Sequence, residues 1–463
     1  MRRGIDRLIG FLCRRILGIY FRRIELVGAR RLPRIAADGR RAPLVAVANH
    51  VNGLIDPMFL LGPLRLPARM LGKSTLWKIP GLAQILDLAG VLPVYRRQDE
   101  GADTSRNLET FARCHEELAR QGVVAIFPEG TSHDEPSLRP LRTGAARIVL
   151  EAEARLGPLG TRIVPIGLHF EERERFRSRA LVVVGDPIDP AEEVALYSRD
   201  PVTAVRLLTD RLSEELERLT LNYSNWDEAR LVERGARILE IDDLDLPHER
   251  RLSAEFAARR DLLAGLAWLR LRQPAAVEAA VAAARHYDEL LLASGLRDEQ
   301  VVASYPVDKI AGYLARQLAL GALALPFAAI GTALHLAPFA VVHAIARRVR
   351  DELNQIATYK VFPGIVIYPF WWIGLAIAAG WIGGWPAGIA ALIFAPLTGG
   401  LALRFHDRRE RLWREGRAYL LLRGRRELAL RLRELRRAAD EKIDLLVELW
   451  VEAQAYEPDA RRT

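Results

Sequence analysis

The stretch PLVAVANHVNGLIDP, residues 43–57, combines a short apolar run with a polar turn. An apolar run of this length, ended by Asn, Gly and Asp, is typical of a buried strand. Four later runs repeat the pattern: GVLPVY (90–95), GVVAIF (122–127), RIVPIGLHF (162–170) and ALVVVGD (180–186). Helical stretches lie between them at 103–122 and 144–157. Strands that alternate with helices predict an α/β domain, with a mixed, partly parallel sheet flanked by helices.

Regions of different composition surround this domain. The 463 residues allow two to four domains, at roughly 100–200 residues each. We expect five regions along the chain: a basic amphipathic membrane-associating helix over 1–31, the α/β domain over 32–190, a helical accessory region over 191–310, membrane-embedded hairpins over 311–403 and a basic helical tail over 404–463.

Two long runs carry no charge. Residues 317–346 and 361–403 contain no Asp, Glu, Lys or Arg. As helices they would extend roughly 45 Å and 64 Å, whereas a bilayer core is about 30 Å thick. The second run therefore predicts two spans with a turn at Gly383 and the residues that follow. Pro326 and Pro338 favour a re-entrant or interfacial hairpin in the first run. The alternative for both runs is a buried helical core.

Positive charge concentrates at the two ends of the chain. The sequence holds 67 Lys and Arg against 58 Asp and Glu, a net charge of +9. Residues 1–31 carry +7 and residues 404–437 carry +8. Basic ends on a nearly neutral body indicate an anionic partner, either nucleic acid or anionic lipid. The uncharged runs favour lipid, so we expect membrane lipids as a partner and no nucleic acid.

The arginines also indicate an orientation. Arg347 and Arg348 lie between the two runs, and the Arg-rich tail follows the second run. The positive-inside rule places both on the cytoplasmic face. Near the start of the chain, arginines interrupt every apolar stretch, which argues against a cleavable signal peptide. Only five basic residues are lysine, which is typical of a GC-rich bacterial genome. We therefore expect a bacterial inner-membrane protein whose catalytic domain faces the cytoplasm.

The sequence offers little for metal or disulfide chemistry. Cys13 and Cys114 are its two cysteines. They cannot build a disulfide framework or a four-ligand zinc site, and no Cys and His cluster has the spacing of a metal site. We therefore expect no metal.

His50 and Asp56 are the first candidates for catalysis. Both lie in the turn after the first predicted strand. A His can take a proton from a hydroxyl, and a carboxylate beside it can fix its tautomer and stabilise the imidazolium. On one helix, six residues would put the two side chains about 240° apart. The pairing therefore needs a turn, which Asn52 and Gly53 supply. The alternative is an ordinary polar turn.

Three later stretches carry further candidates. The turn Pro128-Glu129-Gly130 follows a strand, and its backbone N–H groups suit an anion. Arg96 follows another strand, where its guanidinium fork matches a phosphate. Pro165 lies in an apolar strand and indicates an edge or a strand end. Taken singly, each also fits an ordinary turn, a solvated arginine or a strand-end proline.

In combination and in this order, these stretches resemble the glycerolipid acyltransferase superfamily, through its phospholipid/glycerol acyltransferase domain. The family pattern has four blocks: His, a short spacer and Asp; an Arg that binds substrate phosphate; Phe-Pro-Glu-Gly before a hydroxyl residue; and a Pro in an apolar strand. The blocks here are His50 with Asp56, Arg96, Phe127 to Thr131, and Pro165. The resemblance covers about residues 40–190.

One departure from the family concerns the first block. Five residues separate His50 from Asp56, whereas most of the family has four. The form Asn-His-x-Asn-x-x-x-Asp-Pro is similar to a branch that includes glycerol-3-phosphate and dihydroxyacetone-phosphate acyltransferases of fungal type. The blocks around Lys73 and Arg142 look like that branch too. The acceptor stays open between glycerol 3-phosphate and lysophosphatidate.

The resemblance implies a membrane-bound O-acyltransferase of phospholipid biosynthesis. Its donor would be acyl-CoA or acyl carrier protein as co-substrate, with no other cofactor. His50 would be the general base and Asp56 its support. The residues implied at the acceptor phosphate are Arg96, Glu129, Gly130 and Thr131, and those implied in supporting roles are Asn52, Lys73, Arg142 and Pro165.

Three alternatives remain beside this interpretation. They are thioester hydrolysis or transacylation between lipids, acyl transfer to another lysolipid, and lipid binding without catalysis. The oligomeric state is left open.

Overall fold

The computed structural model describes residues 2–33, 42–79, 81–96, 103–239, 251–302, 307–348 and 353–456. The chain forms two compact units. One comprises Met1–Asn222 with Val342–Ile365, and the other comprises Tyr223–Val341 with Val366–Thr463.

A seven-stranded mixed sheet forms the centre of the first unit, in the order β1-β7-β6-β2-β5-β3-β4. Neighbours from β6 to β4 pair in parallel, whereas β7 is antiparallel to β6 and parallel to β1. The α/β class is therefore confirmed. The strands are β1 (Arg23–Val27), β2 (Leu44–Ala48), β3 (Ala68–Lys73), β4 (Leu92–Val94), β5 (Val123–Ile126), β6 (Arg162–Phe170) and β7 (Arg179–Val184).

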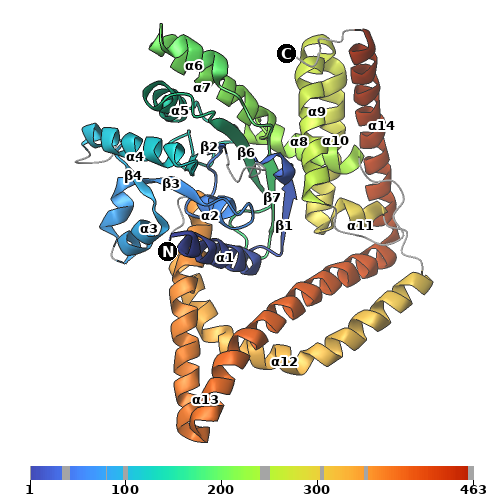
Figure 1. The fold of residues 1–463 in the computed structure, drawn as a ribbon. Coiled ribbons are helices and arrows are strands. Elements are labelled where there is room, and N and C mark those ends of the chain that lie inside the picture. Colours follow the sequence, from blue (N-terminus) through green and yellow to red (C-terminus); the bar gives the residue numbers. More distant parts are fainter. Residues whose placement is uncertain are drawn as a thin grey trace. The chain divides into compact units, whose positions relative to one another are not determined.

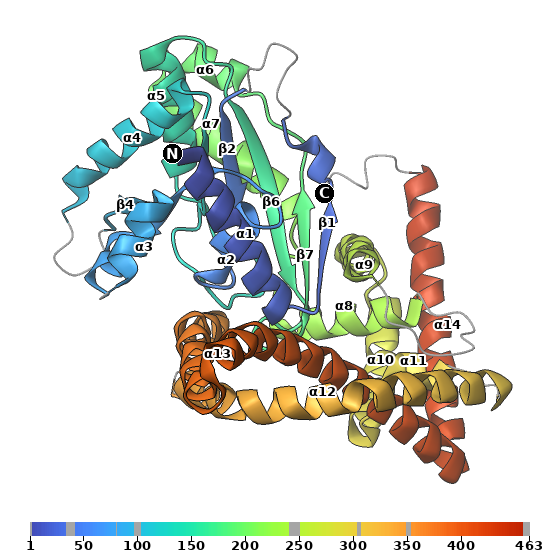
Figure 2. The same ribbon diagram turned by 60° about the horizontal axis from the view of Figure 1, so that its bottom comes forward.

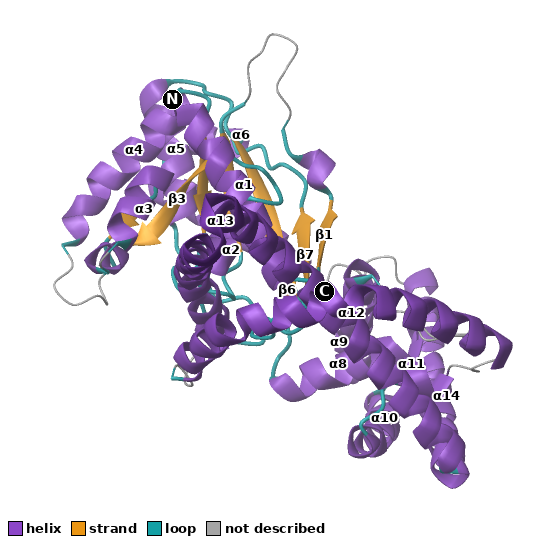
Figure 3. Cartoon of the chain, turned by 90° about the horizontal axis from the view of Figure 1, so that it is seen from below, coloured by secondary structure: helices purple, strands orange, loops and turns teal. Residues whose placement is uncertain are grey.

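Helices cover both faces of this sheet (Figures 1 and 3). Helices α1 and α2 pack on one face, and α4, α5 and α7 pack on the other. The helices of this unit are α1 (Arg2–Tyr20), α2 (Ile55–Leu61), α3 (Leu82–Ala89), α4 (Asn107–Ala119), α5 (Gly144–Leu156), α6 (Ala191–Tyr197) and α7 (Pro201–Arg218). Short 3-10 turns are η1 (Ala29–Arg31), η2 (Ser74–Lys78) and η3 (Thr104–Arg106).

Strand β2 shows why this architecture follows from the sequence. Successive side chains of a strand point to opposite faces. Leu44 and Ala46 join the core beneath α1 and α2, whereas Val45 and Val47 join the core beneath α5. All five residues of β2 are buried, as its continuous apolar sequence predicts for a parallel strand with two covered faces.

Two predicted boundaries differ from the structure. Residues 1–31 are not one helix, because α1 ends at Tyr20 and β1 adds an edge strand beside β7. The first unit also extends beyond residue 190 to Asn222. The reason is the apolar face of α7, whose Leu208 and Leu212 are buried against α5 and the sheet.

The second unit is helical. Apolar residues of α8, α9, α10 and α14 form its main core. Its helices are α8 (Trp226–Leu239), α9 (Leu252–Arg272), α10 (Pro274–Ser294), α11 (Asp298–Val302) and α14 (Arg426–Tyr456), together with most of α12 (Val307–Arg347) and α13 (Leu353–Gly424).

Among the residues that the structure describes, two helices are long and apolar enough to cross a membrane, over Ala319–Arg347 and Gln355–Gly424. Within α13 the helical path breaks at Gly383 and Gly384, and Gly384 takes a φ of 74°. Figure 1 shows the two arms of α13 meeting at this turn, as the glycine pattern predicts.

The first uncharged run does not reverse direction. Helix α12 continues through Pro326 and Pro338 as one helix (Figure 2). The predicted re-entrant hairpin is therefore wrong for the described residues 307–348. A proline removes one hydrogen bond and bends a helix, and in a long helix the flanking turns preserve the path.

Candidate acyltransferase site

The carboxyl ends of four parallel strands bring the predicted motifs to one edge of the sheet. His50 follows β2 and Glu129 follows β5. Lys73 is the last residue of β3, and Arg96 follows β4. Loops at the carboxyl ends of parallel strands meet along one edge, which is the usual ligand site of an α/β sheet. Residues far apart in sequence therefore converge here.

His50 and Asp56 form a hydrogen-bonded pair. His50 Nδ1 lies 2.9 Å from Asp56 Oδ2. The turn predicted at Asn52 and Gly53 is present, with Gly53 at a φ of 44° and the Ile55 N–H donating to the Asn52 carbonyl. This turn absorbs the fifth spacer residue and places Asp56 in the first turn of α2.

Asp56 also organises the backbone around the histidine. Its Oδ2 accepts the N–H groups of Val51 at 2.9 Å and Asn52 at 2.7 Å. The residue is fully buried. With Nδ1–H donated to Asp56, the other nitrogen of His50, Nε2, is the one that can accept a proton. The ring stacks on Phe127 with centroids 4.3 Å apart, which fixes its plane.

Glu129 holds the loop that carries His50. Its Oε1 accepts the His50 N–H at 2.6 Å, and its Oε2 accepts the Arg139 N–H at 3.0 Å. The His133 ring also hydrogen-bonds to Oε2. Glu129 is buried and both its oxygens engage protein donors. It therefore shapes the wall of the site, and its carboxylate is occupied by protein donors and not placed at the acceptor phosphate where the resemblance puts it.

Two arginines meet at Gly130. Arg96 donates from Nη1 to the Gly130 carbonyl at 2.7 Å. The Arg142 side chain lies over the Gly130 Cα, since a Cβ built there would fall 2.5 Å from Arg142 Nε. Gly130 has a φ of +74°, which also favours glycine. The Gly130 N–H donates to the Phe127 carbonyl, so the two guanidinium groups are the donors that form a cationic corner suited to a phosphate.

Thr131 and Lys73 are two further predicted site residues. Thr131 is a partly exposed residue next to Gly130, and its hydroxyl donates to the Ser132 carbonyl at 3.3 Å. Lys73 is exposed at the end of β3, and its Cα pairs with Val94 in β4, two residues before Arg96.

Asn52 and Pro165 are not part of the cationic corner. Asn52 is fully buried, and in the described part of the chain its Nδ2 and Oδ1 have no hydrogen-bond partner. Pro165 lies in β6, where its carbonyl accepts the Gly185 N–H. It is inside the sheet, and the β6–β7 ladder begins at the next residue, Ile166. The predicted edge or strand-end position is therefore wrong, because Pro165 is the fourth of the nine residues of β6, which pairs with β2 on one side and with β7 on the other.

Four residues that the sequence did not single out as site residues also support the site. Asn49 bridges β2 to β6 through two hydrogen bonds with the Leu168 backbone. Arg173 donates to the Val51 carbonyl, and Thr358 accepts the N–H of Leu54. Asn49 opens the first block and His133 lies four residues after Glu129, so proximity to a motif could have indicated both. Arg173 and Thr358 are 122 and 304 residues from their partners, so no local pattern reports them.

The two cysteines do not provide a nucleophile. Both are buried. Burial raises the pKa of Cys13 to about 11 and that of Cys114 to about 12. Because the thiolate is the reactive form, neither is activated near neutral pH. In the described ranges, no three His, Cys, Asp or Glu side chains gather as a metal site would require.

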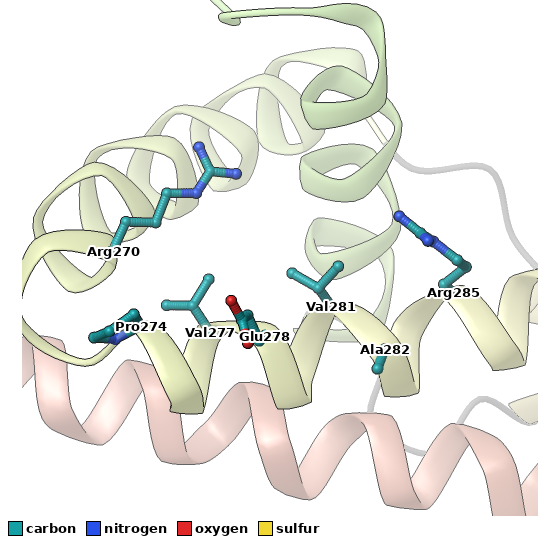
Figure 4. Close-up of a pocket in the computed structure, with 7 residues that line it drawn as sticks. All are labelled: Arg270, Pro274, Val277, Glu278, Val281, Ala282 and Arg285. Carbon is teal, nitrogen blue, oxygen red and sulfur yellow. The ribbon is translucent and has the colours of Figure 1, made fainter.

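A cavity of about 510 Å³ lies in the second unit, between α9 and α10 (Figure 4). Its charged lining residues are Arg270, Glu278 and Arg285. Arg270 also forms an ion pair with Glu228. The cavity lining contains no His or Asp, so it lacks the acid–base pair found beside β2.

Comparison with known proteins identifies similar sequences. Residues 7–169 match the family model described as Acyltransferase. Glycerol-3-phosphate O-acyltransferase 2 of Saccharomyces cerevisiae is 31% identical over 202 residues, which cover 43% of this chain and 26% of that protein. Human 1-acyl-sn-glycerol-3-phosphate acyltransferase beta is 28% identical over 153 residues, covering 33% of this chain and 51% of that protein. The chain thus aligns with about a quarter of one relative and half of the other.

A solved structure is also similar. The 1-acyl-sn-glycerophosphate acyltransferase PlsC of Thermotoga maritima matches with a TM-score of 0.34 and 19% identity, over 46% of this chain and 80% of that one.

The matched region, residues 7–169, is similar to acyltransferase domains. Its resemblance to the glycerolipid acyltransferase superfamily is confirmed by the family model, and the yeast relative supports the glycerol-3-phosphate acyltransferase branch.

Proposed function

We propose that this protein is a membrane-bound O-acyltransferase of glycerolipid synthesis. It would move a fatty acyl group from acyl-CoA or acyl carrier protein to a hydroxyl of glycerol 3-phosphate. The observation that carries this proposal is the His50–Asp56 hydrogen bond at the same sheet edge as the paired guanidinium groups of Arg96 and Arg142. The His50–Asp56 pair would activate a hydroxyl, and the two guanidinium groups would bind a phosphate.

The chemistry requires one proton acceptor and no covalent enzyme intermediate. His50 Nε2 takes the proton of the acceptor hydroxyl while its oxygen attacks the thioester carbonyl. Asp56 stabilises the imidazolium that forms. The C–S bond then breaks, an ester bond remains, and the leaving thiolate takes the proton from His50. The products are an acyl ester and a free thiol, with the base regenerated.

The cationic corner gives the acceptor its orientation. Arg96 and Arg142 would bind the phosphate, and the Thr131 hydroxyl and Lys73 would complete its shell. Glu129, held by protein donors, would keep His50 and Gly130 at a fixed separation. Fixed positions for hydroxyl and base lower the entropic cost of the reaction.

Lysophosphatidate is the alternative acceptor, because it carries the same phosphate and a hydroxyl on the neighbouring carbon. The human relative is named for that activity and the yeast relative for the first acylation. We favour glycerol 3-phosphate on the longer spacing of the first block and the yeast similarity. Plain thioester hydrolysis is disfavoured, since it leaves two arginines at the site without a role.

Membrane association is supported by two separate features. The two helices of spanning length would anchor the chain. Helix α1 adds exposed apolar residues Leu8, Phe11 and Leu12 among its arginines, a composition suited to the headgroup region of anionic lipid. With arginines flanking the uncharged runs, we propose a bacterial inner membrane with the catalytic domain on the cytoplasmic face.

An acyl-transfer assay on full-length protein in liposomes tests the proposal. It offers labelled acyl-CoA or acyl carrier protein with glycerol 3-phosphate or lysophosphatidate. His50→Ala should abolish transfer, whereas the matched control His286→Ala, on an exposed helix face, should retain it. Lysophosphatidate as product would assign the first acylation. Transfer that survives His50→Ala, or folded wild type that acylates neither acceptor, would refute the proposal.

A further inference from the structure

His133 is a buried histidine that the mechanism does not use. Its side chain is 3% exposed. The Glu135 N–H donates to His133 Nδ1 at 3.1 Å, so Nδ1 is an acceptor. A neutral imidazole carries its proton on the other nitrogen. His133 Nε2–H therefore donates to Glu129 Oε2.

His133 and Glu129 together hold both backbone groups of His50. Glu129 Oε1 accepts the His50 N–H, and the His133 N–H donates to the His50 carbonyl at 3.3 Å. Since the two side chains also bind one another, the three residues form a closed ring of hydrogen bonds. Such a ring fixes the peptide planes on either side of the His50 Cα, and thereby the direction of its Cα–Cβ bond.

Arg173 braces the same ring from the loop between β6 and β7. One nitrogen, Nη1, donates to the Val51 carbonyl at 3.1 Å and to the His133 carbonyl at 3.4 Å. Arg173 also forms an ion pair with Asp134 at 2.5 Å. The backbone groups at and next to His50 are therefore held by Glu129, His133 and Arg173, which are not part of the cationic corner.

We propose that His133 is a positioning residue for the acyl transfer, acting through Glu129 on the backbone of His50. This inference rests on the proposed function for its catalytic consequence. Loss of the ring should lower kcat, because a base displaced by about 1 Å can lose roughly 100-fold in rate. It should leave the KM of both substrates nearly unchanged, since His133 is buried and its hydrogen bonds are to Glu129, Glu135, Arg173 and His50 and not to the arginines at Gly130.

The decisive variants are His133→Phe, His133→Gln and His133→Asn. Phe keeps the ring volume and removes the donor. Gln can place an amide N–H near the position of Nε2, whereas Asn is too short to reach Glu129. We expect kcat to fall about 10–100-fold in Phe and Asn and to recover to within about threefold of wild type in Gln. If His133→Phe does not fold, the ratio of kcat between His133→Gln and His133→Asn decides the test.

A matched control separates positioning from loss of a buried histidine. His115 is buried in α4, on the other face of the sheet, and His115→Phe makes the same substitution there. It should leave kcat within about twofold of wild type. Equal kcat in wild type and His133→Phe, or an equal loss in the Gln and Asn variants, would overturn the inference.

Hydrogen exchange provides a readout that does not need activity. Peptides covering residues 48–58 should exchange faster in His133→Phe than in wild type or His115→Phe. Unchanged exchange in that segment would overturn the positioning role. Wild type that shows no acyl transfer would instead refute the proposed function, and the exchange comparison would still report on the ring.

Discussion

Replacing Asp56 with Asn tests the link between the turn after β2 and catalysis. Asp56 Oδ2 accepts three donors: the ring of His50 and the N–H groups of Val51 and Asn52. An Asn oxygen can still accept the backbone donors, so the turn should persist. The negative charge that stabilises an imidazolium on His50 is lost.

The distance gives the magnitude of that loss. Two unit charges 2.9 Å apart interact by about 6 kcal/mol at an effective dielectric of about 20. At 1.36 kcal/mol per tenfold, this predicts a fall in kcat of about 10⁴-fold. KM for the acceptor should change less than about threefold, because Arg96 and Arg142 are untouched.

A stability cost accompanies the change. Asp56 Oδ1 is buried and, among the described residues, has no hydrogen-bond partner. The amide group of Asn would put two donors there, at about 1–3 kcal/mol. For a unit of this size, the melting temperature should fall by about 2–4 °C per kcal/mol. Asp56→Ala removes the acceptor of two backbone N–H groups and should destabilise further.

The assay measures kcat and KM for acyl transfer in liposomes together with the melting temperature. The matched control is Asp200→Asn, at the N-cap of α7, where Asn caps as well as Asp. It should change neither quantity appreciably. A folded Asp56→Asn that retains more than about a tenth of wild-type kcat would refute the role assigned to the pair.

Three further predictions concern other parts of the first unit. Arg142→Gln should raise the acceptor KM about 10–100-fold, as expected for losing a charge-assisted bond, and an unchanged KM would place the phosphate elsewhere. Thr358→Val removes the acceptor of the Leu54 N–H and should lower the melting temperature by a few degrees and kcat about 3–10-fold; wild-type values for both would show that this contact is dispensable. Burial raises the pKa of Cys13 to about 11 and that of Cys114 to about 12. In the unfolded chain both thiols ionise near pH 9, whereas in the folded protein both remain protonated at that pH. The free energy of unfolding should therefore fall as pH rises from about 9 to 11, and a thiol reagent at pH 8 should label neither cysteine before denaturation.

The sheet shows which strands a sequence reveals. Strands β2 and β5 are continuous apolar runs, because helices cover both of their faces. Strands β1 and β3 escape prediction because charged residues interrupt them. In β3, Arg69 forms ion pairs with Asp6 of α1 and Glu117 of α4. Tertiary pairing therefore permits a charge where the pattern alone argues against a strand.

The residues of the site also fall into those that the sequence predicts and those that it does not. His50, Asp56 and Arg96 lie directly after strands and within short motifs, so both residue type and position predict them. The contacts of Arg173 and Thr358 are made to backbone groups by residues more than 100 positions away. The sequence does not indicate which side chain will form a hydrogen bond with a given backbone carbonyl or N–H.

The contact at Thr358 also bears on where the reaction takes place. It belongs to the start of α13, which lies in the first unit together with Ala357 and Val361, both buried in the core beneath the sheet. Lys360 adds a hydrogen bond to the Glu174 carbonyl. The uncharged run begins three residues after Thr358, about 4.5 Å further along the helix.

A helix that enters a bilayer from this point would hold the loop of His50 at the lipid boundary. That is where an acyl chain leaving a thioester must be accommodated, and where a product with one or two acyl chains remains. A catalytic domain tethered by a long flexible linker would lack this constraint. The hydrogen bond between Leu54 and Thr358 therefore supports acyl transfer at the membrane surface over transfer between soluble substrates in bulk water.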